Sequence, residues 1–217
     1  IMSEFKLPTE IVELPSKGLY YPEEHPLHHQ ESIEIKQMTA KEEDLLTSKT
    51  LLKKGIAIDR LIQNLIVDRR IRPDSLLVGD RNALIIAIRK SGYGADYNTQ
   101  LTCPSCATAQ DKSFDLNDFS VYHGDKIDQL KILDQHDGTF LTELPKTKIK
   151  VRFQLLTGRH ENDLAAGMNH DRKKNQTERI ITRQLRSMIV SVNDNSSAEV
   201  VNYLIENIPS MDSRHLR

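Results

Sequence analysis

The chain has 217 residues, enough for one large domain or two small ones. Its 30 basic and 31 acidic residues leave a net charge of -1, so the protein has no overall field that would attract nucleic acid or an anionic membrane. Aromatic residues make up only 5 %, which argues against a base-stacking surface, and no apolar run approaches the roughly 20 residues that span a bilayer.

Residues 1–30 have the pattern of an extended N-terminal arm. Leu14–Gly18 is a turn signal, because it combines proline, serine and glycine. The apolar hook Leu19-Tyr20-Tyr21 follows it, and the local pattern provides no partner for this hook. We therefore predict that Leu19, Tyr20 and Tyr21 bind a neighbouring protein. The alternative is that the arm folds back on its own domain.

Residues 31–94 predict a first unit in which a strand is followed by helices. Ile33–Gln37 alternates apolar and charged residues, which is typical of a half-buried strand. Thr39 and Glu42 have the spacing of a capping box. The helix that they open is expected to run to about Lys54 and to end at the glycine that follows.

Three further helices are expected in this first unit. The first carries an apolar stripe at helical spacing, made of Ile58, Leu61, Ile62, Leu65 and Ile66. Pro73 and Asp74 open a short second helix, because proline suits the first turn of a helix. Asp80 is placed to cap the third, which runs from Arg81 to Lys90. Because the middle of this third helix is apolar on every side, we expect it to be the most deeply buried element.

Residues 95–147 predict a small β insert. Cys103-Pro104-Ser105-Cys106 has the form of a knuckle between two strands, the second of them near Lys112–Asp115. Residues 120–148 are less clearly patterned, with short extended pieces around Lys131–Leu133 and Thr139–Leu144.

Residues 148–217 repeat the pattern of the first unit. Ile149–Leu155 alternates like the first strand, Thr157 corresponds to Thr39, and Asp212 corresponds to Asp80. The two threonines are 118 positions apart and the two aspartates 132, so the second copy contains insertions. The helices expected in this copy cover Arg159–Gln176, Ile181–Val192, Val200–Ile208 and a last segment that begins at Pro209.

The sequence is expected to be a segment of a longer polypeptide, since a residue precedes Met2 and the last residues read as the middle of a helix. Cys103 follows Asp80 by 23 residues, and the same spacing after Asp212 falls beyond Arg217. The duplication therefore predicts that a second Cys pair lies outside these residues.

The Cys103–Cys106 motif is the sharpest chemical signal in the chain. Two thiolates at this spacing on a knuckle chelate one Zn²⁺, which takes four ligands in a tetrahedron. A thioredoxin-type redox site is a poorer interpretation, because Pro104 fits it badly and no amphipathic helix follows the pair. Two inert thiols are the remaining alternative. We predict a structural zinc site of which Cys103 and Cys106 are half, in a reducing compartment.

The remaining zinc ligands are left open by the sequence. His123 is the nearest downstream histidine, and His136 and the cluster His25, His28 and His29 are remoter candidates. His25, His28 and His29 read as a solvated loop between two prolines rather than as a metal cluster. A Cys pair from outside these residues, or from another subunit, is the preferred source.

Six blocks of the sequence carry a resemblance through their order and spacing: Leu14–Pro22, Met38–Leu46, Leu76–Arg81, Tyr93–Tyr97, Cys103–Cys106 and Asp212–Arg217. Together they resemble the baseplate hub subunit family of T-even-like contractile-tailed bacteriophages. The resemblance covers residues 11–217 and is weakest over 120–148. It implies a virion or assembly component without enzymatic activity, acting near the central hub and tail tube. Members of that family continue into a second Cys-x-x-Cys, so the resemblance also implies that half of the zinc site is present here.

These patterns together predict an α+β protein. It consists of two related, mainly helical units, each preceded by a strand, and a small β insert that carries the Cys-x-x-Cys knuckle. The sequence contains no nucleophile–base pair, HExxH or Walker motif, so we predict no enzymatic activity and no catalytic residues.

The predicted function is that of a structural or assembly component of a contractile tail baseplate, within a multi-subunit assembly. Its partners would be other tail and hub proteins, with no nucleic acid and no membrane. It would reside in the virion tail, and in the host cytoplasm during assembly. The first alternative is a tail assembly chaperone that binds the tape-measure protein and is absent from mature virions. A zinc-binding nucleic-acid module is the second alternative.

Overall fold

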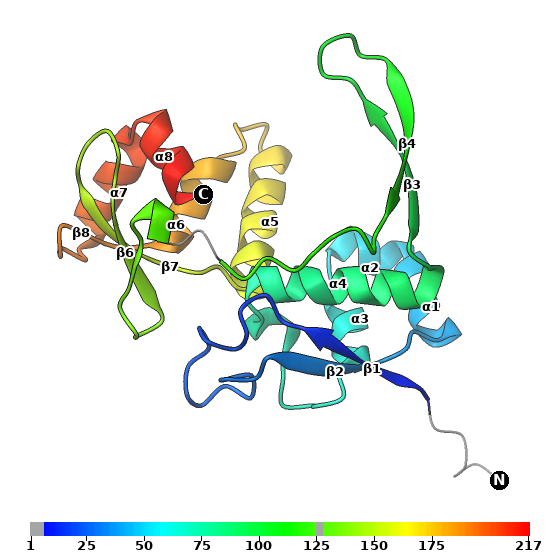
Figure 1. Cartoon of the computed structure of the whole chain (residues 1–217). Coiled ribbons are helices and arrows are strands. Elements are labelled where there is room, and N and C mark those ends of the chain that lie inside the picture. The colour runs from blue at the N-terminus through cyan, green and yellow to red at the C-terminus, as the bar shows by residue number, and fades with distance from the viewer. Residues whose placement is uncertain (1–6, 125–127) are drawn as a thin grey trace. The chain divides into compact units, whose positions relative to one another are not determined.

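The computed structural model describes residues 7–124 and 128–217 (Figure 1). The chain divides into two compact units. The first comprises the described residues up to Leu19 together with His29–Pro73 and Gly79–His123. The second comprises Tyr20–His28, Asp74–Val78 and the described residues from Gly124 onward. Both units combine helices with small antiparallel sheets, so the predicted α+β class is confirmed.

The first unit begins with a two-stranded sheet, in which β1 (Thr9–Glu13) pairs antiparallel with β2 (Ser32–Lys36). Part of the first 30 residues is thus a strand of this unit, which corresponds to the alternative that the arm folds back on its own domain. The segment Tyr20–His28, which contains most of the predicted hook, belongs to the second unit instead.

Three helices follow: α1 (Ala40–Thr47), α2 (Lys49–Lys54) and α3 (Ala57–Leu65). The capping box of Thr39 and Glu42 is confirmed at the start of α1. The single helix predicted up to Lys54 is wrong, because the chain breaks at Ser48, whose hydroxyl accepts a hydrogen bond from the Leu51 amide and caps α2. Gly55 ends α2 in the left-handed conformation, as predicted.

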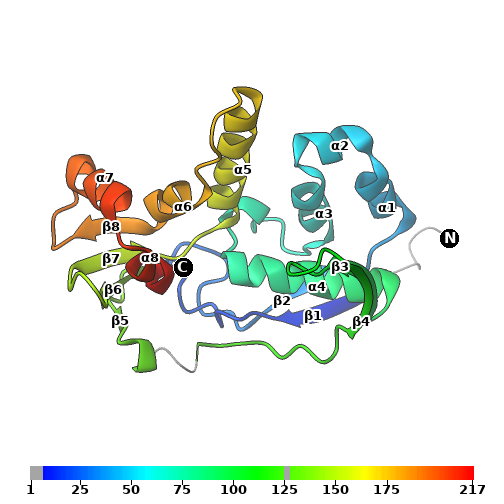
Figure 2. The same ribbon diagram turned by 90° about the horizontal axis from the view of Figure 1, so that it is seen from above.

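Helix α3 is amphipathic and buries Leu61, Ile62 and Leu65. Ile66 leaves the helix and forms a β-bridge with Ile35 of β2. After the 3-10 turn η1 (Pro73–Ser75), helix α4 runs over Val78–Tyr93. Its prediction as the most buried element is wrong: only three of its residues are buried, and Ile86 is 41 % exposed. Helix α4 lies over β1 and β2 (Figure 2).

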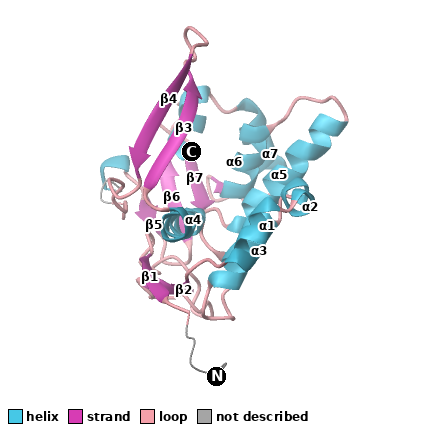
Figure 3. Ribbon diagram, turned by 90° about the vertical axis from the view of Figure 1, so that its right-hand side faces the viewer, coloured by secondary structure: helices cyan, strands magenta, loops and turns pink. Residues whose placement is uncertain are grey.

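A hairpin of β3 (Asp96–Thr102) and β4 (Ala109–Asp115) follows α4 and projects away from it (Figure 1). This is the predicted pair of strands around the Cys-x-x-Cys knuckle. The hairpin is a separate sheet from β1 and β2 (Figure 3).

The second unit contains a four-stranded antiparallel sheet in the order β5-β6-β7-β8. After the 3-10 turn η2 (Asp128–Leu130), its strands are β5 (Leu133–Asp134), β6 (Thr139–Glu143), β7 (Lys150–Gln154) and β8 (Ile189–Val192). Its helices are α5 (Gly158–Lys173), α6 (Ile180–Met188), α7 (Ala198–Asn207) and α8 (Ser210–Leu216).

The helix predicted over Ile181–Val192 is wrong beyond Met188. The chain turns there into β8, in which β-branched residues pair with β7. Phe140 and Phe153 belong to the apolar core of this unit and stack with ring centroids 5.7 Å apart.

The two copies share the register of their first two strands. Thr9 pairs with Lys36 through to Glu13 with Ser32, and Thr139 pairs with Gln154 through to Glu143 with Lys150. The bridge between Ile35 and Ile66 has its counterpart in the pairing of Phe153 with Ile189. The predicted relation between the two units therefore extends one strand further toward the N-terminus than the sequence pattern indicated.

A buried aspartate holds the turn after the first strand of each copy. In the first copy, Asp80 accepts hydrogen bonds from the Ser16 amide (2.9 Å) and the Ser16 hydroxyl (2.6 Å). In the second copy, Asp212 accepts them from the amides of Lys146 (2.7 Å) and Thr147 (3.0 Å). Asp80 lies inside α4 and holds this turn, so its prediction as a helix cap is wrong.

Burial acts to raise the pKa of the Asp212 carboxyl, but the hydrogen bonds from Lys146 and Thr147 outweigh it, and the pKa lies below its ordinary value. The aspartate is thus held in its charged form, which is the better acceptor for the turn amides.

No helix within residues 7–124 and 128–217 is long and apolar enough to cross a membrane.

Candidate functional site

The hairpin of β3 and β4 is exposed over nearly its whole length. Strict pairing places Tyr97 opposite Phe114, and Leu101 lies on the same face because alternate residues of a strand point the same way. These three side chains are 42, 39 and 48 % exposed. The other face carries Asp96, Asp111 and Asp115 with polar neighbours, so the hairpin has one apolar and one acidic face.

Arg89 of α4 holds the base of the hairpin. Its guanidinium donates hydrogen bonds to the carbonyls of Gly94 (2.9 Å) and Asp96 (3.2 Å). The same group lies 5.1 Å from the ring centre of Tyr93 and 5.9 Å from that of Tyr97. The apolar face is therefore anchored at its base, while its outer part lacks a covering element among the described residues.

The tip of the hairpin is the Cys-x-x-Cys knuckle. The Cys103 amide donates to the Thr108 carbonyl (2.9 Å), and the Ala107 amide donates back to the Cys103 carbonyl (2.8 Å). Ala107 has φ 57°, the left-handed conformation that lets the chain reverse directly after the second cysteine. Cys106 is exposed and Cys103 half-buried, so both sulfurs are free thiols at an accessible turn.

Thr108 also acts on the reactivity of Cys106. The hydrogen bond between the Cys106 sulfur and the Thr108 hydroxyl (3.3 Å) lowers the pKa of the Cys106 thiol. The Thr108 backbone and then Cys103 lower it further. A lowered pKa favours the thiolate, which is the form that binds metal.

The described residues do not bring a third metal-ligating group to this knuckle. The histidines considered from the sequence make other contacts. The His123 ring lies 3.0 Å from the Pro15 carbonyl and 2.8 Å from the Glu13 carboxylate. The His25 ring lies 2.9 Å from the Ser75 hydroxyl, the His28 ring 2.7 Å from the Tyr21 carbonyl, and the His136 ring 3.7 Å from the Asp134 carboxylate.

The predicted hook residues differ in their surroundings. Tyr21 is buried, stacks on His25 at 4.4 Å, and accepts a hydrogen bond from the Leu77 amide at its hydroxyl (3.0 Å). Tyr20 packs edge-to-face on Phe140 with ring centres 5.3 Å apart. Leu19 is 53 % exposed. Among the three, Leu19 therefore offers the most surface to another protein.

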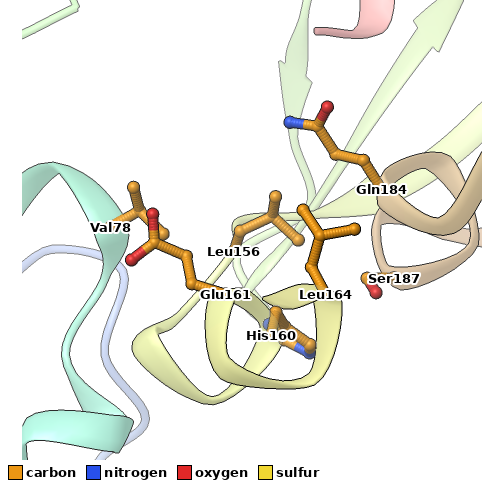
Figure 4. Close-up of a pocket in the computed structure, with 7 residues that line it drawn as sticks. All are labelled: Val78, Leu156, His160, Glu161, Leu164, Gln184 and Ser187. Atoms are coloured by element: carbon orange, nitrogen blue, oxygen red, sulfur yellow. The ribbon is translucent and has the colours of Figure 1, made fainter. Parts of the chain in front are cut away.

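A small pocket of about 100 Å³ lies in the second unit (Figure 4). It is well below the roughly 300 Å³ at which small-molecule sites begin. The His160 ring accepts a hydrogen bond from the Thr157 amide (3.0 Å), which caps α5. We therefore assign the pocket a packing role. Its lining residues are Val78, Leu156, His160, Glu161, Leu164, Gln184 and Ser187.

The sequence interpretation missed the hydrogen bonds of Asp80 and Asp212 to the turns. It predicted the extended piece Thr139–Leu144, which is β6, but did not recognise it as the counterpart of β1. One signal for both was present, because Leu-Pro occurs at 14–15 and again at 144–145, directly after each strand. Those prolines mark equivalent turns, and the two aspartates bind the residues that follow them.

Comparison with known proteins identifies the family. The family model described as T4 bacteriophage base plate protein matches residues 8–140, which is more than half of the chain. The chain therefore belongs to this family. It is a structural component of a phage tail baseplate and so a protein of the virion tail, assembled with other tail proteins. Neither the curated proteins nor the solved structures provide a match to it.

Proposed function

We propose that this protein is a non-enzymatic subunit of the central hub region of a contractile tail baseplate, where it binds neighbouring tail proteins. The family match over residues 8–140 carries the proposal. The matched range includes β1, α4 and the complete β3–β4 hairpin. The matched range therefore contains β3 and β4, which are exposed over nearly their whole length and carry apolar side chains.

The hairpin supports a role in a permanent assembly. An isolated two-stranded hairpin is marginally stable in water, and this one exposes Tyr97, Leu101 and Phe114 on a single face. Covering that face would contribute about 1.5–3 kcal/mol for each large side chain that becomes fully buried. A neighbouring tail protein that packs on this face would stabilise the hairpin and be held by it.

The zinc site is a second part of the proposal. Cys103 and Cys106 would supply two thiolates of a structural zinc site, and two further ligands would come from outside the described residues. The reversed turn at Ala107 and the accessible thiols fit a knuckle that holds a metal at its tip. When bound, zinc would fix the tip of the hairpin and so the orientation of its apolar face.

Metal content tests the zinc site in protein purified without chelator. We expect bound zinc, lost in Cys103→Ser and in Cys106→Ser together with a lower melting temperature of the hairpin region. Ser105→Ala, in the same turn, is the matched control and keeps the metal. Protein without zinc, with unchanged stability in both cysteine variants, would reduce the pair to inert thiols.

The hook remains a predicted partner contact. Tyr20 and Tyr21 are anchored by Phe140 and Leu77, so in this proposal they hold the loop that presents Leu19. Leu19→Asp is expected to lower incorporation into tails, whereas Leu52→Asp, at a residue of similar exposure on α2, is the control. Equal incorporation of both variants would contradict a contact at Leu19.

The hub role is tested in mature tails. A phage that carries a tagged copy of the gene is grown, its tails are purified, and the ratio of this protein to other baseplate proteins is measured by mass spectrometry. We expect a fixed ratio and cross-links to hub proteins. Loss of the protein from mature tails, with cross-links to the tape-measure protein in assembly intermediates only, would instead identify a tail assembly chaperone.

A further inference from the structure

The outer edge of β1 has no paired strand among the described residues. The Gln37 amide donates to the Pro8 carbonyl and the Leu14 amide to the Glu31 carbonyl. Because bonded pairs alternate along an antiparallel ladder, Glu10 and Val12 bond to β2, while Thr9 and Ile11 point their amides and carbonyls outward. Such an edge is a template for another strand.

The second copy shows what covers this edge. In β6, Leu141 and Phe140 pair with Leu133 and Asp134 of β5. The Thr139 carbonyl accepts a hydrogen bond from the Gln135 amide (3.0 Å). By register, Thr139, Phe140 and Leu141 are the equivalents of Thr9, Glu10 and Ile11.

The open stretch in the first copy matches the stretch that β5 covers in the second. Ile11 is 67 % exposed, whereas Leu141 is half-buried. Leu7, just before β1, is also exposed. At the other end of β1, the His123 ring contacts the Glu13 carboxylate and the carbonyl of Pro15, just beyond the strand. The stretch over residues 9–11 thus lacks the strand that its counterpart has.

Glu10 indicates the chemistry of the missing strand. It stands where the second copy has Phe140, and its Oε1 atom is buried without a hydrogen-bond partner among the described residues. A residue directly opposite Glu10 on an added strand would share its face. A lysine or arginine there would supply the donor that this oxygen lacks.

We propose that the β1 edge binds an extended segment of another protein as an antiparallel strand, with an apolar residue opposite Ile11 and a basic residue opposite Glu10. This rests on the proposed function only in taking the partner to be a neighbour in the tail. A second copy of the chain fits less well. Self-pairing centred on Ile11 would put Val12 opposite Glu10 and leave its carboxylate without a donor.

A peptide taken from the protein itself is the probe. The peptide with the sequence of residues 131–137, carrying Asp134→Lys, has a leucine for Ile11 and a lysine for Glu10. It is added at about 1 mM to the full chain, a concentration that detects even millimolar binding. We expect hydrogen exchange of the Thr9 and Ile11 amides to slow by about twofold if the Kd is about 1 mM, and by about tenfold if it is about 0.1 mM. The unchanged peptide should protect less, because its aspartate opposes Glu10.

Two variants of the protein locate the binding. Ile11→Pro removes an outward amide without removing a bond to β2, and proline is tolerated in edge strands at such positions. We expect it to abolish the protection while the melting temperature stays within a few degrees. Ile11→Val keeps the amide and is the matched control.

Three outcomes would overturn the proposal. One is the absence of protection at Thr9 and Ile11 with either peptide. Another is equal protection in the Ile11→Pro variant. The third is protection that depends on protein concentration without peptide, which would identify a second copy as the occupant. None of these outcomes depends on whether the protein persists in mature tails. The hub role is therefore tested independently of strand binding at β1.

Discussion

Strands β1 and β6 are built alike and surrounded differently. Both pair over five residues in the same register with the strand that follows, and both lead into a Leu-Pro turn bound by a buried aspartate. Yet β6 lies between β5 and β7, whereas β1 has β2 alone among the described residues. The two strands thus share their register and the aspartate that binds the turn after them, and they differ in burial because only β6 has a second strand beside it among the described residues.

The turns themselves differ in length. Leu14 bonds to Glu31 in the first copy, whereas Leu144 bonds to Ile149 in the second, so the first turn contains 12 additional residues. This insertion includes Tyr20 and Tyr21, which pack in the second unit. A loop inserted into one copy therefore contributes to the core of the other, at no cost to the shared register.

The largest difference between the copies is expected at equivalent core-facing positions. Phe140→Ala removes a ring that contacts both Tyr20 and Phe153, and should destabilise the second unit by about 3–5 kcal/mol. Glu10→Ala, at the same position of the first copy, should change stability by less than about 0.5 kcal/mol, because the carboxylate has an unsatisfied buried oxygen.

Denaturant unfolding with hydrogen exchange resolved by residue measures both variants, since the two units need not unfold together. Equal losses at Phe140 and Glu10 would show that the copies have equivalent cores, which would contradict the comparison.

The two aspartates test what the copies share. Asp80→Ala and Asp212→Ala each leave turn amides without an acceptor, so each should cost about 2–3 kcal/mol. Hydrogen exchange should report the loss in the first unit for Asp80 and in the second for Asp212. Asp44→Ala on the exposed face of α1 is the control. A loss confined to one of the two variants would mean that only one turn depends on its aspartate.

Much of this architecture was predictable from the sequence. The capping box at Thr39, the left-handed end at Gly55 and the strands around Cys103 follow from local rules that operate within a few residues. The order of strands and helices in both copies was also predictable from the sequence, because the alternation of apolar residues in strands and their spacing in helices are local patterns.

Two of the errors have a common physical origin in partners that are distant in sequence. Asp80 looked like a helix cap, but its acceptor oxygens bind Ser16, 64 residues away. The apolar run Ile189–Val192 continued a helical stripe, but pairing with β7 draws it into a strand. Neither the contact with Ser16 nor the pairing with β7 can be predicted from the few residues around each position.

The candidate sites were predictable to different degrees. The Cys103–Cys106 knuckle follows from spacing alone, whereas the open edge of β1 depends on knowing that β5 covers its counterpart. The sequence predicts a short extended piece around Lys131–Leu133, but a two-residue strand such as β5 carries no pattern that places it beside β6. This difference between the copies therefore required the structure.

The stability of the second unit should depend on pH through Asp212. Because its folded-state pKa lies below the unfolded value of about 3.9, the turn is fully stabilised above that value and loses the contribution as pH falls below it. Asp212→Asn removes this dependence. The slope of unfolding free energy against pH, measured from about pH 5 to pH 2.5, should be shallower in the variant.

Part of the acid slope should survive in that variant. A hydrogen bond from Arg183 (2.9 Å) lowers the pKa of Asp171 and so adds a contribution of the same sign. An unchanged slope in Asp212→Asn would show that the turn holds its geometry without the charge.

The smallest expected difference lies on the outer faces of β1 and β6. Leu141→Thr removes apolar contact from a half-buried position beside β5, and should cost about 1 kcal/mol. Ile11→Thr, at the equivalent position, should cost less than about 0.5 kcal/mol in the isolated chain, because the side chain is 67 % exposed and threonine is an equally good strand former. When the strand-binding peptide is added, the free-energy cost of Ile11→Thr should rise toward that of Leu141→Thr. The reason is that an added strand gives Ile11 the neighbour that Leu141 already has. A penalty at Ile11 that stays unchanged with bound peptide would mean that the added chain does not cover this face.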